Sequence, residues 1–256
     1  HQAKISHALR TSDLYDTDAE NGRSQGVGNF CLMGSGSWNF NGFCPPFLSA
    51  WSMQFLNWIA NEQMQTMHYN ETWQDSLCKI APMELLNDSL PNYYRLEISP
   101  TEYFLLEFRL QDTNLNGEFD YNELGGDSTR FDFFVDDYQN TEFDYFLPGN
   151  GTGSGILIWH IDENIINQNF DGSFAQNTIN GNAAHKGVDL EEADGTQDLD
   201  LFNIYNPNMY GSANDAYRFQ NNPEFTPVSN PNSRSYYGRG DISVSRISIV
   251  DERMSF

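Results

Sequence analysis

The apolar residues of this chain occur in short runs, and this limits what it can fold into more than any other feature. The richest runs, residues 103–106 and 156–161, have the length of β-strands and are bounded by polar segments. A membrane-spanning helix needs about 20 consecutive apolar residues. With 39% hydrophobic residues among 256, the chain can still bury a core. The sequence therefore predicts a globular protein without a membrane span.

The periodicity of the apolar residues predicts few helices. A short helical pattern covers 5–9, and apolar residues at helical spacing predict one amphipathic helix over 49–64. Residues 31–47 are rich in Gly, Pro and aromatic residues and predict a packed, irregular loop. Alternating patterns predict strands over 93–98, 102–110, 155–161 and 242–250. We expect one α+β domain over 1–256, mostly antiparallel β, because no linker divides the chain.

The charge of the chain is strongly negative. It has 13 Lys and Arg against 36 Asp and Glu, a net charge of -23. Such a surface repels phosphate backbones, which argues against a nucleic-acid partner. The carboxylates serve solubility or supply the oxygen ligands that Ca²⁺ requires. The three cysteines, Cys31, Cys44 and Cys78, lack metal-binding spacing, and their odd number leaves at least one thiol free.

One acidic segment, residues 112–123, matches the twelve-residue calcium-loop template. Gly117 stands at position 6, where the template requires a sharp turn. The alternative is an acidic turn between two strands, and the strand-like residues before the segment already separate it from helix-loop-helix proteins. We expect a structural calcium site. Its ligand candidates are Asp112, Asn114, Asn116, Glu118, Asp120 and Glu123.

A second acidic segment, residues 187–195, follows no template. Its weaker calcium candidates are Asp189, Glu192 and Asp194. A solvated acidic loop and a second cation site both fit this composition, so the sequence leaves the two open.

Several motifs together resemble a known family. The segments are HALRTSDLYDTD at 7–18, GVGNFCLMGSGSW at 26–38, EYFLLEFR at 102–109, LPGNGTGSGILIWHID at 147–162 and HKGVDLEEADG at 185–195. In this order they resemble the immune-inhibitor-A-like (M6) secreted zinc metallopeptidases, from the zinc helix onward. The resemblance implies the C-terminal portion of a zincin-like catalytic domain in a longer, secreted chain, with long calcium-binding loops, zinc and peptide-bond hydrolysis.

The chain departs from this family at the zinc helix itself. In a HExxH helix, two histidines four residues apart bind zinc and the Glu between them activates a water molecule. If His7 is the second histidine, Ala3 replaces the first, Lys4 replaces the Glu and Arg10 replaces the usual glycine. None of the three replacements can perform the family role.

A second alignment treats His1 and Gln2 as the remnant of His-Glu. His1 and His7 are then about 240° apart around a helix, and glutamine is no base. Under either alignment His7 and Asp13 remain as zinc ligands, one short of a catalytic zinc site. The resemblance also implies that Met33 lies in a turn beneath the metal.

Two function hypotheses follow. The first is a secreted M6 metallopeptidase-like domain whose hydrolytic activity is impaired or lost, a pseudoenzyme. The alternative is a non-catalytic, calcium-stabilised extracellular surface, matrix or filament-forming protein, because an aromatic, lysine-poor surface suits protein contacts and self-assembly. Both imply a protein or peptide partner. A carbohydrate-binding module shares the aromatic residues and the calcium loop, but the family motifs argue against it. Because the sequence begins at His1 without a signal pattern, we expect a processed product or a fragment.

Overall fold

The computed structural model describes residues 10–72, 77–84, 89–119, 142–172, 177–238, 240, 242–250 and 253–256. These residues form an α+β fold with few helices, as predicted. The α-helices are α2 (Ala50–Phe55) and α3 (Glu163–Asn169), and short 3-10 helices cover Gly28–Phe30, Ser35–Gly42, Asn61–Gln63, Asp198–Asp200 and Ala213–Asp215. Among the described residues, no helix has the length and apolar character needed to cross a membrane.

The strands form two sheets. They are β1 (Met64–Met67), β2 (Lys79–Ile80), β3 (Tyr93–Glu97), β4 (Glu102–Arg109), β5 (Gly155–Asp162), β6 (Val188–Leu190), β7 (Ser248–Val250) and β8 (Arg253–Ser255). The larger sheet has the order β1-β3-β4-β5-β6 and the smaller one β2-β8-β7. Every pair is antiparallel except β1 with β3. The predicted strands at 93–98, 102–110 and 155–161 are confirmed as β3, β4 and β5.

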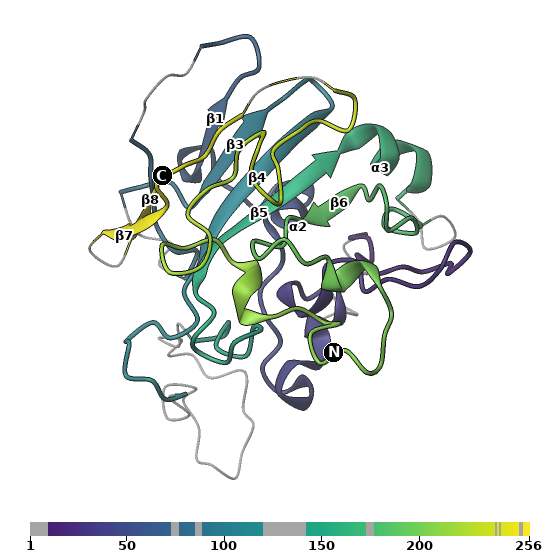
Figure 1. Cartoon of the computed structure of the whole chain (residues 1–256), viewed down its shortest axis with the longest axis horizontal. Helices are drawn as coiled ribbons and strands as arrows, with labels where there is room; N and C mark the ends of the chain where they lie inside the picture. Colours follow the sequence, from purple (N-terminus) through teal and green to yellow (C-terminus); the bar gives the residue numbers. More distant parts are fainter. Residues whose placement is uncertain are drawn as a thin grey trace.

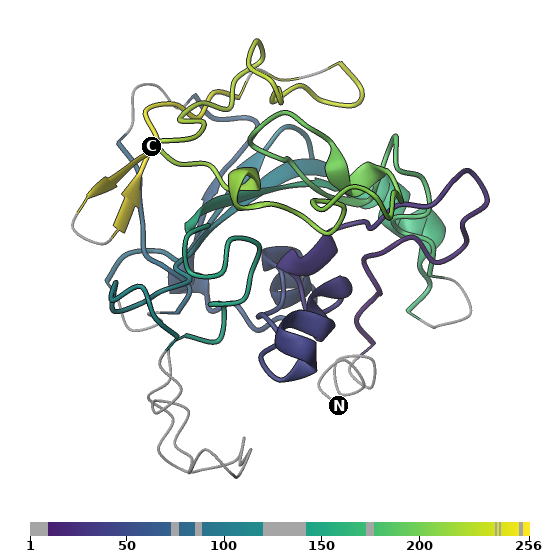
Figure 2. The same ribbon diagram turned by 60° about the horizontal axis from the view of Figure 1, so that its bottom comes forward.

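The larger sheet is buried on both faces, because every residue of β4 and β5 is buried. Tyr103 and Leu105 face a core built with the N-terminal segments, including Trp51. Phe104 and Leu106 face a second core built with later loops. Figure 2 shows the sheet between the purple and blue N-terminal segments on one side and the green and yellow loops on the other. The alternation of side chains along a strand explains how one strand serves two cores.

The helix predicted over 49–64 is much shorter in the structure. Ser49 caps α2 by accepting a hydrogen bond from the Ser52 N–H. The helix ends at Phe55, and Asn57 adopts a left-handed conformation with φ 56°, so the prediction is wrong beyond that point. Ile59 still packs against the core, but from a turn. A turn therefore reproduced the apolar spacing that indicated further helix.

Two other predictions need adjustment. The packed loop at 31–47 is confirmed as irregular, but it contains the 3-10 helix Ser35–Gly42, interrupted by Phe40 and Asn41 at positive φ. The strand predicted over 242–250 is reduced to β7, while Val244 forms an isolated bridge with Phe225. Of these two, only the strand over 242–250 was predicted too long.

A buried ionic group connects the N-terminal segments to the sheet. The Arg109 guanidinium donates to Asp144 at 2.6 Å, to Glu107 at 3.0 Å and to the carbonyl of Leu48 at 2.6 Å. Asp144 also accepts from the Phe47 N–H at 2.9 Å. Buried charges require such partners, and here the partners come from both layers. This group fixes the segment before α2 against β4.

Candidate functional site

A cleft of about 590 Å³ lies among the N-terminal segments. Residues of 13–19, 23–25 and 32–38 line it together with Phe202. The N-terminal segments are purple in Figure 1, and the chain around 202 is green. The cleft therefore brings together two of the segments that carry the family resemblance, 7–18 and 26–38, and a loop far from them in sequence.

The wall of the cleft is built around Leu14, which is completely buried. Its N–H donates to the carbonyl of Met33 at 2.9 Å, and its own carbonyl accepts from the Val27 N–H at 3.0 Å. Gly26 has φ 60°, and a Cβ atom there would lie 1.8 Å from the Leu14 carbonyl oxygen. Only glycine fits this position. The segments 13–19 and 32–38 are thereby held side by side.

Two buried asparagines from much later in the chain form hydrogen bonds with the same wall. The Asn177 side-chain oxygen accepts from the Ser12 hydroxyl, and the Asn177 carbonyl accepts from the Thr17 hydroxyl. The Asn180 amide donates to the Leu14 carbonyl at 3.0 Å. Sequence analysis did not single out these asparagines, because only the folded chain brings residues 12–17 and 177–180 together.

Both described residues of the predicted zinc region lie on the cleft. Asp13 accepts from the Asn177 amide at 3.5 Å, and the Met33 sulfur accepts from the Thr11 hydroxyl at 3.6 Å. Burial and the neighbouring Asp13 carboxylate raise the pKa of Tyr15. The third residue of the prediction, His7, lies outside the described residues, as do Ala3 and Lys4.

The described residues do not complete a zinc site. Nowhere in them do three His, Cys, Asp or Glu side chains converge closely enough to hold a metal ion. Arg10, which aligns with the glycine of the family motif, has φ 66°. This is a left-handed conformation that glycine adopts readily and arginine rarely does. The backbone at position 10 thus has the conformation that a glycine would favour.

The first half of the predicted calcium loop is coiled by its own side chains. Asp112 accepts from the Gly117 N–H at 2.7 Å, Asn114 from the Asn116 N–H at 3.0 Å, and Asn116 from the Glu118 N–H at 2.7 Å. Gly117 has φ 79°, as the turn at position 6 requires. Asp120 and Glu123 lie outside the described residues.

Asp112 leaves one carboxylate oxygen without a hydrogen bond in this loop. The residue is only 5% exposed, and its Oδ1 atom has no hydrogen-bond partner among the residues that the structure describes. A buried carboxylate oxygen without a partner is costly. A divalent cation bound by oxygen ligands is one partner that would remove this cost, so this oxygen has the chemistry of a calcium ligand.

A buried lysine next to the second acidic segment pairs with two carboxylates. The fully buried Lys186 ammonium forms ion pairs with Asp189 and with Asp200, the latter at 2.5 Å. Burial alone lowers the pKa of Lys186, but the two carboxylates outweigh it and raise the pKa above its usual value. Lys186 therefore places a positive charge among these carboxylates.

The other two calcium candidates of this segment serve the backbone. Glu192 is fully buried and accepts from the N–H groups of Asp198 at 2.8 Å and Leu199 at 3.3 Å. Asp194 is exposed and accepts from the Thr196 N–H at 2.8 Å. The structure thus gives all three candidates, Asp189 included, donors of the protein itself.

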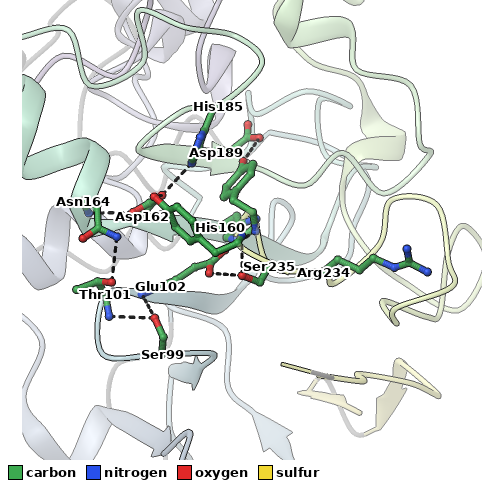
Figure 3. Close-up of polar contacts among 12 residues, drawn as sticks. Ser99, Thr101, Glu102, His160, Asp162, Asn164, His185, Asp189, Arg234 and Ser235 are labelled. Atoms are coloured by element: carbon green, nitrogen blue, oxygen red, sulfur yellow. Dashed lines mark hydrogen bonds and ion pairs between the residues drawn. The ribbon is translucent and has the colours of Figure 1, made fainter. Parts of the chain in front are cut away.

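A buried polar network surrounds His160 (Figure 3). Glu102 accepts from His160 Nε2 at 3.0 Å, from the Ser235 hydroxyl and from the Tyr236 N–H at 2.7 Å. His160 Nδ1 bonds Glu191 at 3.1 Å. Although burial alone lowers the pKa of His160, these two carboxylates raise it to about 9. The imidazole is therefore charged at neutral pH.

The network continues through stacked rings to the surface. The Tyr236 ring stacks on His160 with centroids 4.3 Å apart and on His185 at 4.0 Å. His185 bonds Asp162 at 2.8 Å, and the Tyr237 hydroxyl donates to the same carboxylate at 2.7 Å. The available signal was polar residues inside buried strand patterns. The network anchors residues 235–237 on β4 and β5 and is structural.

Comparison of the chain with family models, with curated proteins and with solved structures found no match.

Proposed function

We propose that this chain is a secreted domain of the M6 metallopeptidase type and that the cleft along 13–19 and 32–38 is its peptide-binding cleft. One observation carries the proposal. The D-x-Y-D-T segment and the G-S-W turn, which carry the resemblance, line a single cleft with Asp13 and Met33 on its wall. The left-handed conformation of Arg10 at the family's glycine position supports the same alignment.

The proposal includes binding of peptides without their hydrolysis. A zincin needs two histidines and a Glu on its zinc helix, and Ala3 and Lys4 stand at two of these positions. A lysine cannot take a proton from a zinc-bound water as a carboxylate does, because it is positively charged near neutral pH. The domain is on this proposal a pseudoenzyme that keeps the cleft of its family.

The proposal also assigns structural calcium to the loop 112–123. Its support is the match to the calcium-loop template together with the unpartnered, buried Oδ1 atom of Asp112. Calcium bound there would fix the segment that follows β4. This role agrees with a secreted protein, because extracellular calcium modules work at about 10⁻⁴–10⁻³ M.

The experiment is elemental analysis of the purified chain, combined with peptide binding and hydrolysis. We expect calcium without zinc, saturable binding of peptides and no cleavage. A variant carrying Ala3→His, Lys4→Glu and Arg10→Gly should bind about one zinc per chain and gain hydrolytic activity. One zinc per unaltered chain with cleavage would contradict the loss of catalysis, and failure to bind any peptide would contradict the assignment of the cleft.

A second candidate function has an observation of its own. The segment 201–210 exposes large apolar side chains, among them Leu201 at 68%, Ile204 at 65% and Tyr205 at 89%. Exposed apolar residues of this density are typical of protein contacts. They favour the alternative of a calcium-stabilised extracellular protein that self-assembles. Light scattering across concentration tests it, and a monomer at all concentrations would contradict it.

A further inference from the structure

We infer that the cleft selects a polypeptide segment that carries a basic side chain, arginine or lysine. The inference rests on the proposed function and names its ligand class. Three aspartates and one arginine are the charged residues that line the cleft. The chain around them has a net charge of -23 and only three lysines. A cleft in which negative side chains outnumber positive ones attracts cationic ligands.

The aromatic residues of the cleft suit a cation as well. Trp38 is 77% exposed, Phe202 44% and Tyr15 39%, and all three line the cleft. The faces of such rings attract guanidinium and ammonium groups, most strongly at tryptophan. Because Trp38 is so exposed at the cleft, its indole is accessible to a ligand side chain.

The cleft already contains one example of this contact. The guanidinium of Arg23 lies 5.7 Å from the centre of the Phe202 ring. The cleft thus already accommodates a guanidinium group against one of its aromatic rings. A ligand arginine would repeat with Trp38 the contact that Arg23 makes with Phe202.

Two aspartates of the cleft shape its wall by accepting hydrogen bonds from the backbone. Asp16 accepts from the N–H groups of Asp18 at 3.1 Å, Ala19 at 2.9 Å and Ser24 at 3.3 Å. Asp18 accepts from the Glu20 N–H at 3.0 Å and is itself exposed. These backbone donors hold the two carboxylates in place on the wall.

Asp18 also stands between two cavities. Besides the cleft it lines an adjoining cavity of about 250 Å³, which reaches His185 and Asn169. A bound polypeptide that runs from one cavity into the next would pass this carboxylate, which could then contact one of its side chains. Asp18 and Trp38 are therefore the residues that we assign to recognition of the basic group.

The test measures binding of labelled Gly-Ser peptides with one central arginine, lysine, glutamine or glutamate to the full chain. We expect the arginine and lysine peptides to bind about tenfold more tightly than the glutamine peptide, as ion-pair and cation–π contacts allow. The advantage should shrink as salt is raised, because salt screens exposed charges. The glutamate peptide should bind most weakly.

Matched variants locate the effect. Trp38→Ala and Asp18→Asn should each reduce the preference several-fold, and Asn keeps the acceptor for the Glu20 N–H. The controls are Trp58→Ala, an exposed tryptophan outside the cleft, and Asp194→Asn, an exposed aspartate that accepts from the N–H two residues on, as Asp18 does. Both controls should leave the preference unchanged.

The outcomes separate this inference from the proposed function. Equal binding of basic and neutral peptides, weakened by Trp38→Ala, would overturn the basic preference and leave the peptide cleft standing. A loss of preference with Asp194→Asn equal to that with Asp18→Asn would also overturn it, because the net charge would then be responsible. Absence of binding by every peptide would overturn both.

Discussion

The two acidic segments of this chain balance their negative charge in different ways. In 185–200 the buried ammonium of Lys186 lies against Asp189 and Asp200. In 112–118 the coiled loop satisfies one oxygen of Asp112 with the Gly117 N–H and leaves the other without a hydrogen bond. Residues 185–200 therefore contain their own cation, Lys186, whereas residues 112–118 contain no lysine or arginine.

The number of carboxylates in a segment therefore does not identify a cation site. Both segments are acidic, and both supplied calcium candidates, but only 112–123 matches the calcium-loop template. What separates them is a single lysine at position 186 and the spacing that matches a calcium loop at 112–123.

The largest effect is expected for Lys186→Met. The change leaves the buried Asp189 and the partly buried Asp200 without their cation, and breaking a buried ion pair in this way costs about 3–5 kcal/mol. Urea denaturation measures the free energy of unfolding, and Lys79→Met, at an exposed lysine, is the matched control. A loss below about 1 kcal/mol would mean that Lys186 does not balance the segment.

The next effect concerns calcium at the other segment. Calcium at one hundred times its dissociation constant should stabilise the chain by about 2.7 kcal/mol, and EGTA should remove this gain in thermal unfolding. Asp112→Asn should abolish the response to calcium, whereas Asp194→Asn should preserve it. If the unfolding temperature of the unaltered chain ignored both calcium and EGTA, the loop would not be a calcium site.

The next effect is smaller for each pH unit and comes from the protonation of Glu192. Burial, followed by the nearby Asp215 carboxylate, raises the pKa of Glu192 from 4.5 to about 9. Between these values the folded chain binds a proton that the unfolded chain releases. The contribution to stability is therefore complete below pH 4.5 and is lost as the pH rises through 9. One proton corresponds to a slope of about 1.4 kcal/mol per pH unit.

The variant Glu192→Gln should remove that slope, because glutamine cannot release a proton. Urea denaturation from pH 5 to pH 9 measures it, and Glu224→Gln, at an exposed glutamate, should keep the slope of the unaltered chain. An unchanged pH dependence in Glu192→Gln would assign the proton to another group.

The smallest effect is expected for Asp194→Asn. Asp194 is exposed and its acceptor role toward the Thr196 N–H is available to asparagine. Surface substitutions of this kind change stability by about 0.5 kcal/mol or less. A loss of more than about 1 kcal/mol in the free energy of unfolding, measured by urea denaturation, would show that the Asp194 carboxylate stabilises the fold.

The sequence predicted the parts of the fold that depend on local pattern. Strands β3, β4 and β5 follow from alternating and apolar residues, and the mostly antiparallel sheet is confirmed. The helix after Ser49 was predicted too long, because the apolar spacing continued into a turn that begins near Asn57. Periodicity reports which residues are buried, and a turn can bury them as well as a helix.

The site was predictable only where a motif marks it. Asp13 and Met33 were found through the family resemblance, and both line the cleft. Phe202 and Asn177 were not found, because their roles depend on contacts with residues far away in the sequence. Lys186 was missed for a related reason, since burial of a single lysine leaves no local pattern.

The two hydrogen bonds of Asn177 also determine when the cleft can assemble. They join it to Ser12 and Thr17, 165 and 160 positions earlier in the chain. During synthesis the N-terminal wall must therefore wait until residue 177 has left the ribosome before it reaches its final position. Contacts of such long sequence separation form slowly. The ordering of the cleft is thus a late step in folding, later than the pairing of β3 with β4.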